Sequence, residues 1–294
     1  MQVNEYPWMA GVGLKGALSP MCGGAVVSDQ YVLTAAHCCD GKQAAELQVD
    51  LGDHDWSHGA EADNFRVGVA AVKMFPGYQH GNNLNNDVCL LRLARALSFP
   101  AVPGVRPVCL PPDTADTYAD RAAMVAGWGK TGSGNGISNV LLETELVVWP
   151  QVSSLLRESI STSTSILTVP VQADCRAAYW SGMITSAMMC VAKPASPIDS
   201  TCNGDSGSSV IVRNGDNYDT VGVVSWGIAG CRAGAPSVMA RVTSFLSWIR
   251  TEISDSALCP RSYTAPPTTT PSPCVTIKGG AVAGQLAAAN HVVL

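Results

Sequence analysis

Three short segments of the sequence carry side chains that together can transfer an acyl group. His37 lies in the run TAAHC, Asp87 stands just before the apolar run VCLLRL, and Ser206 lies in the run CNGDSGS. A serine hydroxyl becomes a nucleophile when a base takes its proton, a carboxylate fixes the tautomer of that base, and backbone N–H groups stabilise the oxyanion. Each segment by itself has an ordinary structural reading, as a core histidine, a turn-capping aspartate or a glycine-rich loop. In combination they predict a nucleophilic serine served by a histidine and an aspartate.

The order of these residues and the runs around them indicate a family. The order histidine, aspartate, serine is that of chymotrypsin, and it differs from the orders in subtilisin and the α/β-hydrolases. The runs CGG at 22–24, GWG at 127–129 and VSWG at 224–227 match framework motifs of the same group. From Tyr6 to about Ile253 the chain therefore resembles the chymotrypsin-like (trypsin-like) serine peptidases. The resemblance implies an all-β fold of two six-stranded antiparallel barrels with a C-terminal α-helix.

The resemblance also implies a role for each residue of the site, because this family supplies the general description of the triad. Ser206 attacks the peptide carbonyl, His37 acts as general base and then as general acid, and Asp87 orients the imidazole. The N–H groups of Gly204 and Ser206 form the oxyanion hole. Ser208 replaces a glycine of the family, so a positive backbone φ at this position would strain the turn. The implied reaction is peptide-bond hydrolysis through an acyl-enzyme, without a cofactor.

A specificity pocket beside the nucleophile is implied by the same resemblance. Ser225, Trp226 and Gly227 line its entrance, and the absence of a side chain on Gly227 admits a large residue of the substrate. Ser200, six residues before Ser206, forms the base of the pocket. A carboxylate at the base would favour Arg or Lys, whereas serine predicts a chymotrypsin-type preference for large apolar or aromatic residues.

Two further residues leave details of this specificity open. Ser237 stands where the family often has a pocket-wall glycine, and its side chain would narrow the pocket towards Leu or Met. Asp199 lies next to the predicted base, so a small shift of the loop would offer a negative charge to the substrate.

Activation in this family depends on a new N-terminus similar to IVGG, whose ammonium pairs with the carboxylate before the nucleophile. Here that carboxylate is Asp205, and this sequence begins after the position of the family's terminus. We therefore expect a truncated N-terminus and an Asp205 without a partner, which is costly for a buried charge. The expected state resembles a zymogen, with the triad present and an unreliable oxyanion hole.

The 11 cysteines predict disulfides and an oxidising, secretory environment, although the first residues contain no secretory signal. The resemblance implies the bridges Cys22–Cys38, Cys175–Cys190 and Cys202–Cys231. Because His37 and Asp87 must touch, we predict a further bridge between their neighbours, Cys39–Cys89; the alternative is two buried free thiols.

The remaining cysteines have no such assignment. Cys109 resembles the cysteine that ties many family members to their propeptide, so we expect its partner to lie outside this chain. Cys259 and Cys274 are left without a predicted partner.

Short apolar runs separated by Gly, Pro, Asn and Asp predict the strands of the fold. The expected strands lie at 25–27, 31–33, 88–93, 141–148 and 220–224. One late segment, 244–253, places Phe245, Trp248 and Ile249 at helical spacing and predicts the C-terminal helix.

The organisation predicted along the chain is one peptidase domain at 1–254, followed by a linker and short tail at 255–294. The linker is rich in Pro and Thr at 265–273, which favours an extended conformation. Within the domain, 149–168 is a Ser- and Thr-rich segment that interrupts an expected strand, and we interpret it as a suspect insertion from translated non-coding sequence.

Composition excludes several functional classes. The 294 residues are 47% hydrophobic and 14% charged, with a formal net charge of −5. This balance lacks the basic surface of a nucleic-acid binder, and no apolar run approaches the roughly 18 residues of a membrane span. Expected partners are therefore protein or peptide substrates and protein protease inhibitors, and we expect a secreted, extracellular monomer.

The sequence favours this interpretation over a calcium site and over two alternative functions. Asp53 and Asp63 match positions of a calcium loop in some family members, but Ala60 takes an intervening acidic position, so we expect a solvated acidic loop and no metal.

One alternative function is a catalytically silent protease homologue that serves as a binding or regulatory module. Such proteins usually lack a triad residue, and this sequence lacks none. The other alternative is a serine hydrolase that acts on esters.

Overall fold

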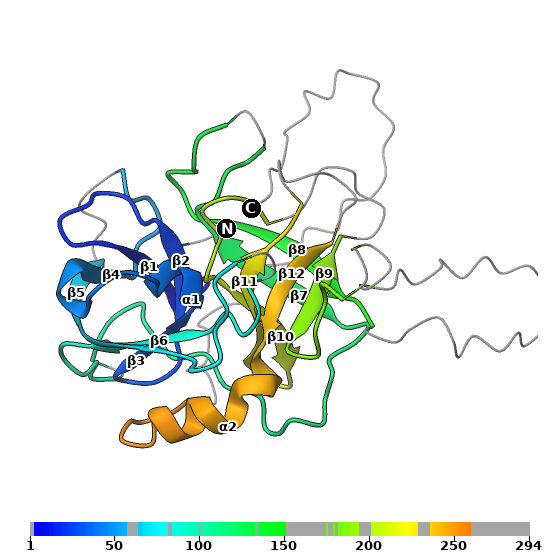
Figure 1. Ribbon diagram of the computed structural model, residues 1–294. Coiled ribbons are helices and arrows are strands. Elements are labelled where there is room, and N and C mark those ends of the chain that lie inside the picture. The colour runs from blue at the N-terminus through cyan, green and yellow to red at the C-terminus, as the bar shows by residue number, and fades with distance from the viewer. Residues whose placement is uncertain are drawn as a thin grey trace, which may run out of the picture.

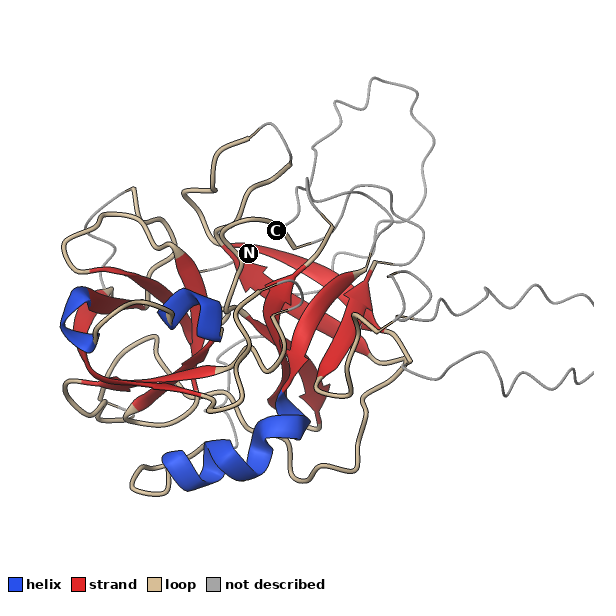
Figure 2. Ribbon diagram, in the orientation of Figure 1, coloured by secondary structure: helices blue, strands red, loops and turns tan. Residues whose placement is uncertain are grey.

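The computed structural model describes residues 3–57, 64–81, 84–99, 101–132, 135–150, 175, 179, 182–193, 201–228 and 236–259 of the chain. These residues form two closed antiparallel barrels and a helix, α2 (Val242–Glu252), that follows the second barrel (Figures 1 and 2). The predicted fold class, two six-stranded barrels with a C-terminal helix, is confirmed.

The first barrel occupies the N-terminal part of the chain (blue and cyan in Figure 1). Its strands are β1 (Met9–Leu14), β2 (Cys22–Val26), β3 (Tyr31–Thr34), β4 (Leu47–Leu51), β5 (Phe65–Met74) and β6 (Cys89–Leu93). They pair in the closed order β1-β2-β3-β6-β5-β4. Between β3 and β4 lie two single-turn helices, α1 (Ala36–Cys39) and η1 (Ala44–Glu46). The predicted strands at 25–27, 31–33 and 88–93 correspond to β2, β3 and β6.

The second barrel repeats this arrangement. Its strands are β7 (Ala122–Gly127), β8 (Leu142–Val148), β9 (Met188–Ala192), β10 (Ser209–Asn214), β11 (Asn217–Trp226) and β12 (Ser237–Arg241). They pair in the closed order β10-β11-β12-β9-β8-β7. The predicted strands at 141–148 and 220–224 correspond to β8 and β11. The suspect insertion at 149–168 begins directly after β8, and from residue 151 onward it lies outside the described residues.

Apolar side chains fill both barrels and the boundary between them. Leu33, Leu51 and Leu91 are fully buried in the first barrel. Ile211 and Val223 belong to the second barrel, but they pack within the same buried cluster as the first. The barrels therefore contact each other directly, which sets the relative positions of residues that the two barrels contribute to one site.

Helix α2 connects the end of the second barrel back to the first. Phe245 and Ile249 are buried, and the ring of Phe75, the residue after β5, lies 5.0 Å from that of Phe245 and 5.4 Å from that of Trp248. The predicted helix at 244–253 and its apolar face are confirmed. These ring contacts place α2 against the first barrel, and the described part of the chain ends there at residue 259.

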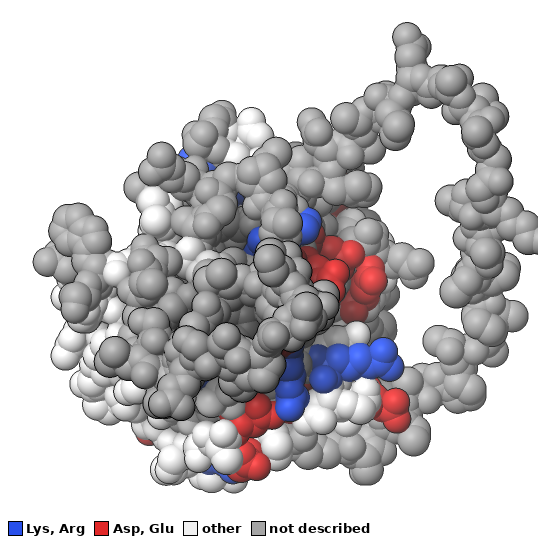
Figure 3. Space-filling view, turned by 90° about the vertical axis from the view of Figure 1, so that its right-hand side faces the viewer, with Lys and Arg blue, Asp and Glu red and all other residues white. Residues whose placement is uncertain are grey.

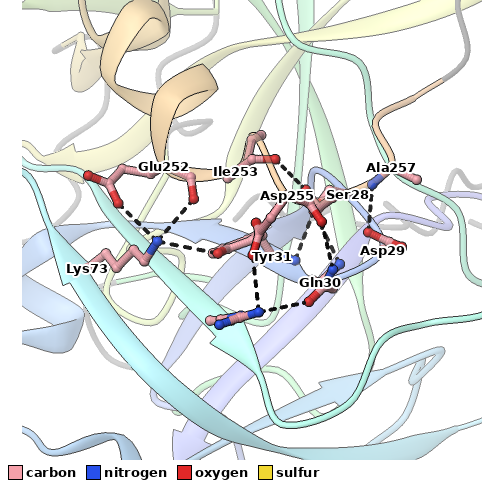
Figure 4. A network of polar contacts seen from close by, with 11 residues as sticks. Ser28, Asp29, Gln30, Tyr31, Lys73, Glu252, Ile253, Asp255 and Ala257 are labelled. Atoms are coloured by element: carbon pink, nitrogen blue, oxygen red, sulfur yellow. Dashed lines mark hydrogen bonds and ion pairs between the residues drawn. The ribbon is translucent and has the colours of Figure 1, made fainter.

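The residues after α2 are held against the first barrel by polar contacts (Figure 4). Lys73 Nζ lies 3.0 Å from both the backbone oxygen and the carboxylate Oε2 of Glu252. Asp29 N donates to Ala257 O over 3.1 Å, and Ala257 N donates to the Asp29 carboxylate over 2.8 Å. The segment 253–259 is therefore part of the folded structure.

These contacts correct the expectation for Cys109. We expected its partner outside the chain, whereas the structure bonds Cys109 to Cys259, with a Cα–Cα distance of 5.0 Å. The physical reason is the path of α2, which brings the following residues back to the first barrel; Leu258 there pairs with Ser28. No local pattern in the sequence records this return.

Removal of the bridge with the double variant Cys109→Ala/Cys259→Ala should lower the free energy of unfolding by about 2–4 kcal/mol, because the unfolded chain gains conformational entropy. Urea unfolding of the variant and the unmodified chain measures the difference. An unchanged midpoint with an unchanged slope would contradict the prediction.

Candidate active site

His37 and Asp87 meet because the strands that lead to them are neighbours. Thr34, the last residue of β3, pairs with Cys89, the first residue of β6. His37 follows β3 and Asp87 precedes β6, so both lie at the same end of this strand pair. The Nδ1 atom of His37 lies 2.7 Å from Asp87 Oδ2, and the backbone N–H of His37 donates to Asp87 Oδ1 over 2.8 Å. The Asp87 side chain is 1% exposed and that of His37 is 23% exposed.

The second barrel adds a contact that sequence reasoning missed. Ser225 Oγ, from β11, donates to Asp87 Oδ2 over 2.5 Å. Ser225 was predicted only as a residue of the pocket entrance, and its contact with Asp87 joins residues 138 positions apart. Both oxygens of Asp87 are thereby held as acceptors, one by a backbone group and the other by two side chains. The phenol of Tyr78 is also close: burial, followed by the charge of Asp87, raises the pKa of Tyr78 to about 12.

Two disulfides adjoin His37, and a third lies in the second barrel at β9. The structure contains the bridges Cys22–Cys38, Cys39–Cys89 and Cys175–Cys190. Cys202 is also disulfide-bonded, and its predicted partner Cys231 lies outside the described residues.

Ser206 lies in the loop before β10, and its backbone contacts the first barrel. Ser206 O accepts a hydrogen bond from Gly23 N over 2.8 Å and lies 3.7 Å from the Sγ atom of Cys38, the neighbour of His37. Gly207 has φ +85°, and a β-carbon there would lie 2.2 Å from Thr34 Oγ1. Only glycine allows this loop to approach the end of β3 so closely.

Ser208 does not produce the strain that a positive φ would cause. It is not among the described residues with positive φ, and its side chain is fully buried. It faces Gly23, where a β-carbon would lie 2.0 Å from Ser208 Oγ. Thus the CGG run before the histidine provides the space that this serine requires.

Two backbone N–H groups of the loop around Ser206 remain available among the described residues. Asp205 N, Gly207 N and Ser208 N donate to backbone carbonyls over 2.8 to 3.0 Å. Within the described part of the chain, the N–H groups of Gly204 and Ser206 donate to no backbone carbonyl. Gly204 has φ +106°, a conformation that suits glycine. Such free donors are what an oxyanion requires.

Asp205 corrects a second expectation. We expected this carboxylate to lack a partner, but its Oδ1 accepts from Gly129 N and its Oδ2 from Cys202 N, each over 2.8 Å. A β-carbon on Gly127 or Gly129 would lie 2.2 to 2.4 Å from its oxygens, so the GWG run makes room for the carboxylate. The reason for the error is that both donors are backbone groups, whose direction depends on tertiary structure. Full burial nevertheless outweighs these bonds and raises the pKa of Asp205 to about 7.

This raised pKa predicts a pH-dependent stability for the chain Met1–Leu294. Between about pH 4 and pH 7 the folded carboxyl keeps a proton that the unfolded carboxyl has lost, so this group's contribution to the free energy of unfolding falls as the pH rises. The total fall is about 4 kcal/mol at 1.36 kcal/mol per pKa unit. Asp205→Asn removes the ionisation, so the free energy of unfolding of the variant minus that of the unmodified chain should rise by this amount over the same range.

Urea unfolding of both proteins at several pH values between 4 and 7 measures this difference. Because all other groups titrate in both proteins, their effects cancel in the comparison. Parallel stability curves for the two proteins would contradict the raised pKa of Asp205.

A cavity of about 280 Å³ lies beside Ser206 and contains the predicted entrance residues Ser225, Trp226 and Gly227. Its described lining consists of 201–204, Ser206 and 224–228. Asn203 and Ile228 line it as well and were not predicted, although both adjoin motif residues. Ser200 and Asp199 lie outside the described residues.

Ser237 lies close to this cavity but behind its entrance. It is 3% exposed, and a β-carbon on Gly227 would lie 3.9 Å from its Oγ atom. The structure therefore brings Ser237 next to Gly227, as a pocket-wall position requires.

Among the described residues, one group of side chains has the spacing of metal ligands: Cys22, His37 and Cys38. The two sulfur atoms form a disulfide with each other, which leaves no thiolate to bind a metal. Asp63, one of the two residues weighed for calcium, lies outside the described residues, whereas Asp53 is described.

The described surface carries charges of both signs. On the face shown in Figure 3, Lys and Arg side chains lie next to Asp and Glu side chains. No helix within the described ranges is long and apolar enough to span a bilayer.

Comparison with known proteins agrees with this geometry. The family description Trypsin matches residues 1–165 and 149–249. The chain is 35% identical over 232 residues to "Serine protease 1" of Rattus norvegicus, and this match covers 79% of this chain and 80% of that protein. It is 32% identical over 235 residues to "Trypsin I-P1" of Gallus gallus, with 80% of each chain covered. It is also 31% identical over 261 residues to the "Proclotting enzyme" of Tachypleus tridentatus, with 84% of this chain and 63% of that protein covered. The chain belongs to the trypsin family of serine proteases.

Proposed function

We propose that this chain is a secreted serine endopeptidase that hydrolyses peptide bonds through an acyl-enzyme on Ser206. The observation that carries the proposal is the His37–Asp87 pair, with Nδ1 and Oδ2 2.7 Å apart, beside a serine whose adjoining N–H donors are free among the described residues. The alternative of a silent homologue with a binding or regulatory role is not favoured, because no triad residue is missing.

The chemistry follows from these contacts. Ser206 Oγ forms a bond to the carbonyl carbon of the substrate while Nε2 of His37 takes the hydroxyl proton. The carbonyl electron pair moves to the oxygen, which accepts hydrogen bonds from the N–H groups of Gly204 and Ser206. Asp87 accepts a hydrogen bond from Nδ1–H of His37 and stabilises the imidazolium. When the C–N bond breaks, His37 gives the proton to the leaving amine. Water then attacks the ester carbonyl of the acyl-enzyme while His37 takes a proton from it. His37 returns that proton to Ser206 Oγ as the C–O bond breaks and the carboxylic acid leaves.

Specificity for large apolar or aromatic residues before the scissile bond is the second part of the proposal. It is supported by the cavity of about 280 Å³, whose described lining contains no charged side chain, and by Gly227 at the entrance. Ser200 is assigned as the base of the pocket.

Peptides that differ only in Phe, Leu or Arg before the scissile bond test this specificity. We expect the highest kcat/KM for Phe, because a fitting apolar side chain gains about 1–3 kcal/mol over one that leaves the pocket partly filled. Dominant cleavage after Arg would overturn the assignment and point to a carboxylate in the pocket.

Control by zymogen activation is the third part. A fully buried carboxylate with a raised pKa, as at Asp205, is stabilised in its ionised form by a cation. The α-ammonium of a newly cleaved N-terminus is the cation that this family uses, so activation should order the loop that carries Ser206.

Labelling with a fluorophosphonate tests the whole proposal. The chain is expressed with an IVGG-type N-terminus restored behind a cleavable propeptide, the propeptide is removed, and the protein is exposed to the reagent. Covalent labelling of the activated protein is expected. Failure to label a folded, activated protein would favour the binding-module alternative.

A further inference from the structure

The helix that carries His37 is too short to hold its own position. Helix α1 has four residues and no side-chain cap. Helices of this length are not stable alone, because nucleation costs more than one turn of hydrogen bonds returns. The position of the imidazole must therefore come from bonds between α1 and the barrel around it.

Three successive residues of α1 supply these bonds, and each leads to a different segment. His37 binds Asp87. Cys38 is bonded to Cys22 at the start of β2, and Cys39 is bonded to Cys89 at the start of β6. Disulfides therefore fix α1 to strands of the barrel on two sides.

The attachment at Cys89 leads to the segment that positions Asp87. Cys89 is fully buried and pairs both with Thr34 in β3 and with Met74 in β5, so it belongs to a strand with two neighbours. Asp87 lies two residues before it, directly after Asn86, whose φ is +60°. The covalent path from the imidazole to the carboxylate through Cys39–Cys89 is therefore short and ends on a fixed strand.

We propose that the Cys39–Cys89 disulfide is a positioning device that holds His37 and Asp87 in the geometry for proton transfer. The inference rests on the proposed function, because it assigns Cys39 and Cys89 a role in the same reaction. Without this bridge, α1 is covalently attached only on the side of Cys22, and the imidazole gains freedom relative to the carboxylate. Displacements of about 1 Å in such a site cost up to about a hundredfold in rate.

A second disulfide offers a matched control. Cys109–Cys259 also ties distant segments: Cys109 pairs with Asp219 at the start of β11, and the residues before Cys259 pack beside Ser28 and Asp29, ahead of β3. His37 lies beyond the opposite end of β3. Loss of the control bridge therefore removes a covalent link of the same chemical kind without touching the triad.

The test compares the double variants Cys39→Ala/Cys89→Ala and Cys109→Ala/Cys259→Ala in the activated, full-length protein. We expect kcat to fall about tenfold with KM unchanged in the first variant, and both constants to stay unchanged in the second. The NMR signal of the proton between His37 Nδ1 and Asp87 should weaken or move upfield in the first variant alone. A purely structural bridge would lower the unfolding midpoint without affecting kcat or this signal.

A third variant keeps the test decisive if the alanine pair does not fold. Cys39→Val/Cys89→Ala keeps the buried site filled with apolar atoms but lacks the covalent link, and its kcat should fall by the same factor. A folded variant of either kind with the kcat and the NMR signal of the unmodified enzyme would overturn the inference. An unmodified enzyme that hydrolyses no peptide would instead contradict the proposed function.

Discussion

Replacing Ser206 by alanine should lower kcat/KM of the activated protease by about a millionfold. The variant keeps the backbone N–H donors of positions 204 and 206 and the His37–Asp87 pair. It has no nucleophile to form the acyl-enzyme. Hydrolysis of a chromogenic peptide and labelling by a fluorophosphonate measure the two consequences, and both signals should disappear.

The neighbouring serine supplies the control for this experiment. Ser208 is fully buried against Gly23, so Ser208→Ala should keep both hydrolysis and labelling. His37→Ala should cost nearly as much as Ser206→Ala, and the double variant should lose little more, because the two residues act as one unit. Persistent labelling of Ser206→Ala would show that another residue is the nucleophile.

Replacing Asp87 by asparagine should lower kcat about ten-thousandfold. The contacts explain the size of the effect. Oδ1 accepts the backbone N–H of His37, so the oxygen of the asparagine amide must stay at this position. Its NH₂ group then faces His37 Nδ1 and donates to it, which places the imidazole proton on Nε2. In that tautomer Nε2 cannot take the proton of Ser206.

Steady-state kinetics on the peptide substrate measure this loss, which should appear in kcat with little change in KM. Asp116→Asn is a matched control, because Asp116 is partly exposed, pairs with Arg121 and accepts from the backbone N–H of Tyr118, away from the triad. Its kcat should stay within about twofold of that of the unmodified enzyme, because the Asp116–Arg121 ion pair does not contact the triad. Loss of a surface ion pair also costs only about 0–1 kcal/mol of stability, so the variant should stay folded. An Asp87→Asn enzyme with nearly full kcat would contradict the role of the carboxylate.

Local motifs were sufficient for the identities of the candidate residues and for the family resemblance that implied the fold. Runs such as 31–33 and 88–93 became β3 and β6, as short apolar segments rich in β-branched and aliphatic residues between turn residues favour buried strands. The run CNGDSGS placed Ser206 in a loop whose glycines permit close approach of the backbone. Such signals act over a few neighbouring residues and are therefore visible in the sequence.

Contacts between distant segments could not be predicted in this way. The bond from Ser225 to Asp87 joins the two barrels, and Cys109 meets Cys259 only because α2 returns the chain to the first barrel. The partners of the Asp205 carboxylate are backbone N–H groups, which every residue except proline carries and which no sequence motif distinguishes.

The sequence by itself therefore determined the candidates His37, Asp87 and Ser206 and, through the family resemblance that its motifs carry, the two-barrel fold, because residue types and short spacings encode motifs. Tertiary structure alone decided how Asp87 is held, how Asp205 is satisfied and where Cys109 is bonded. The physical reason is that these contacts depend on the packing of the barrels and of α2, which places groups side by side that lie up to 150 residues apart along the chain.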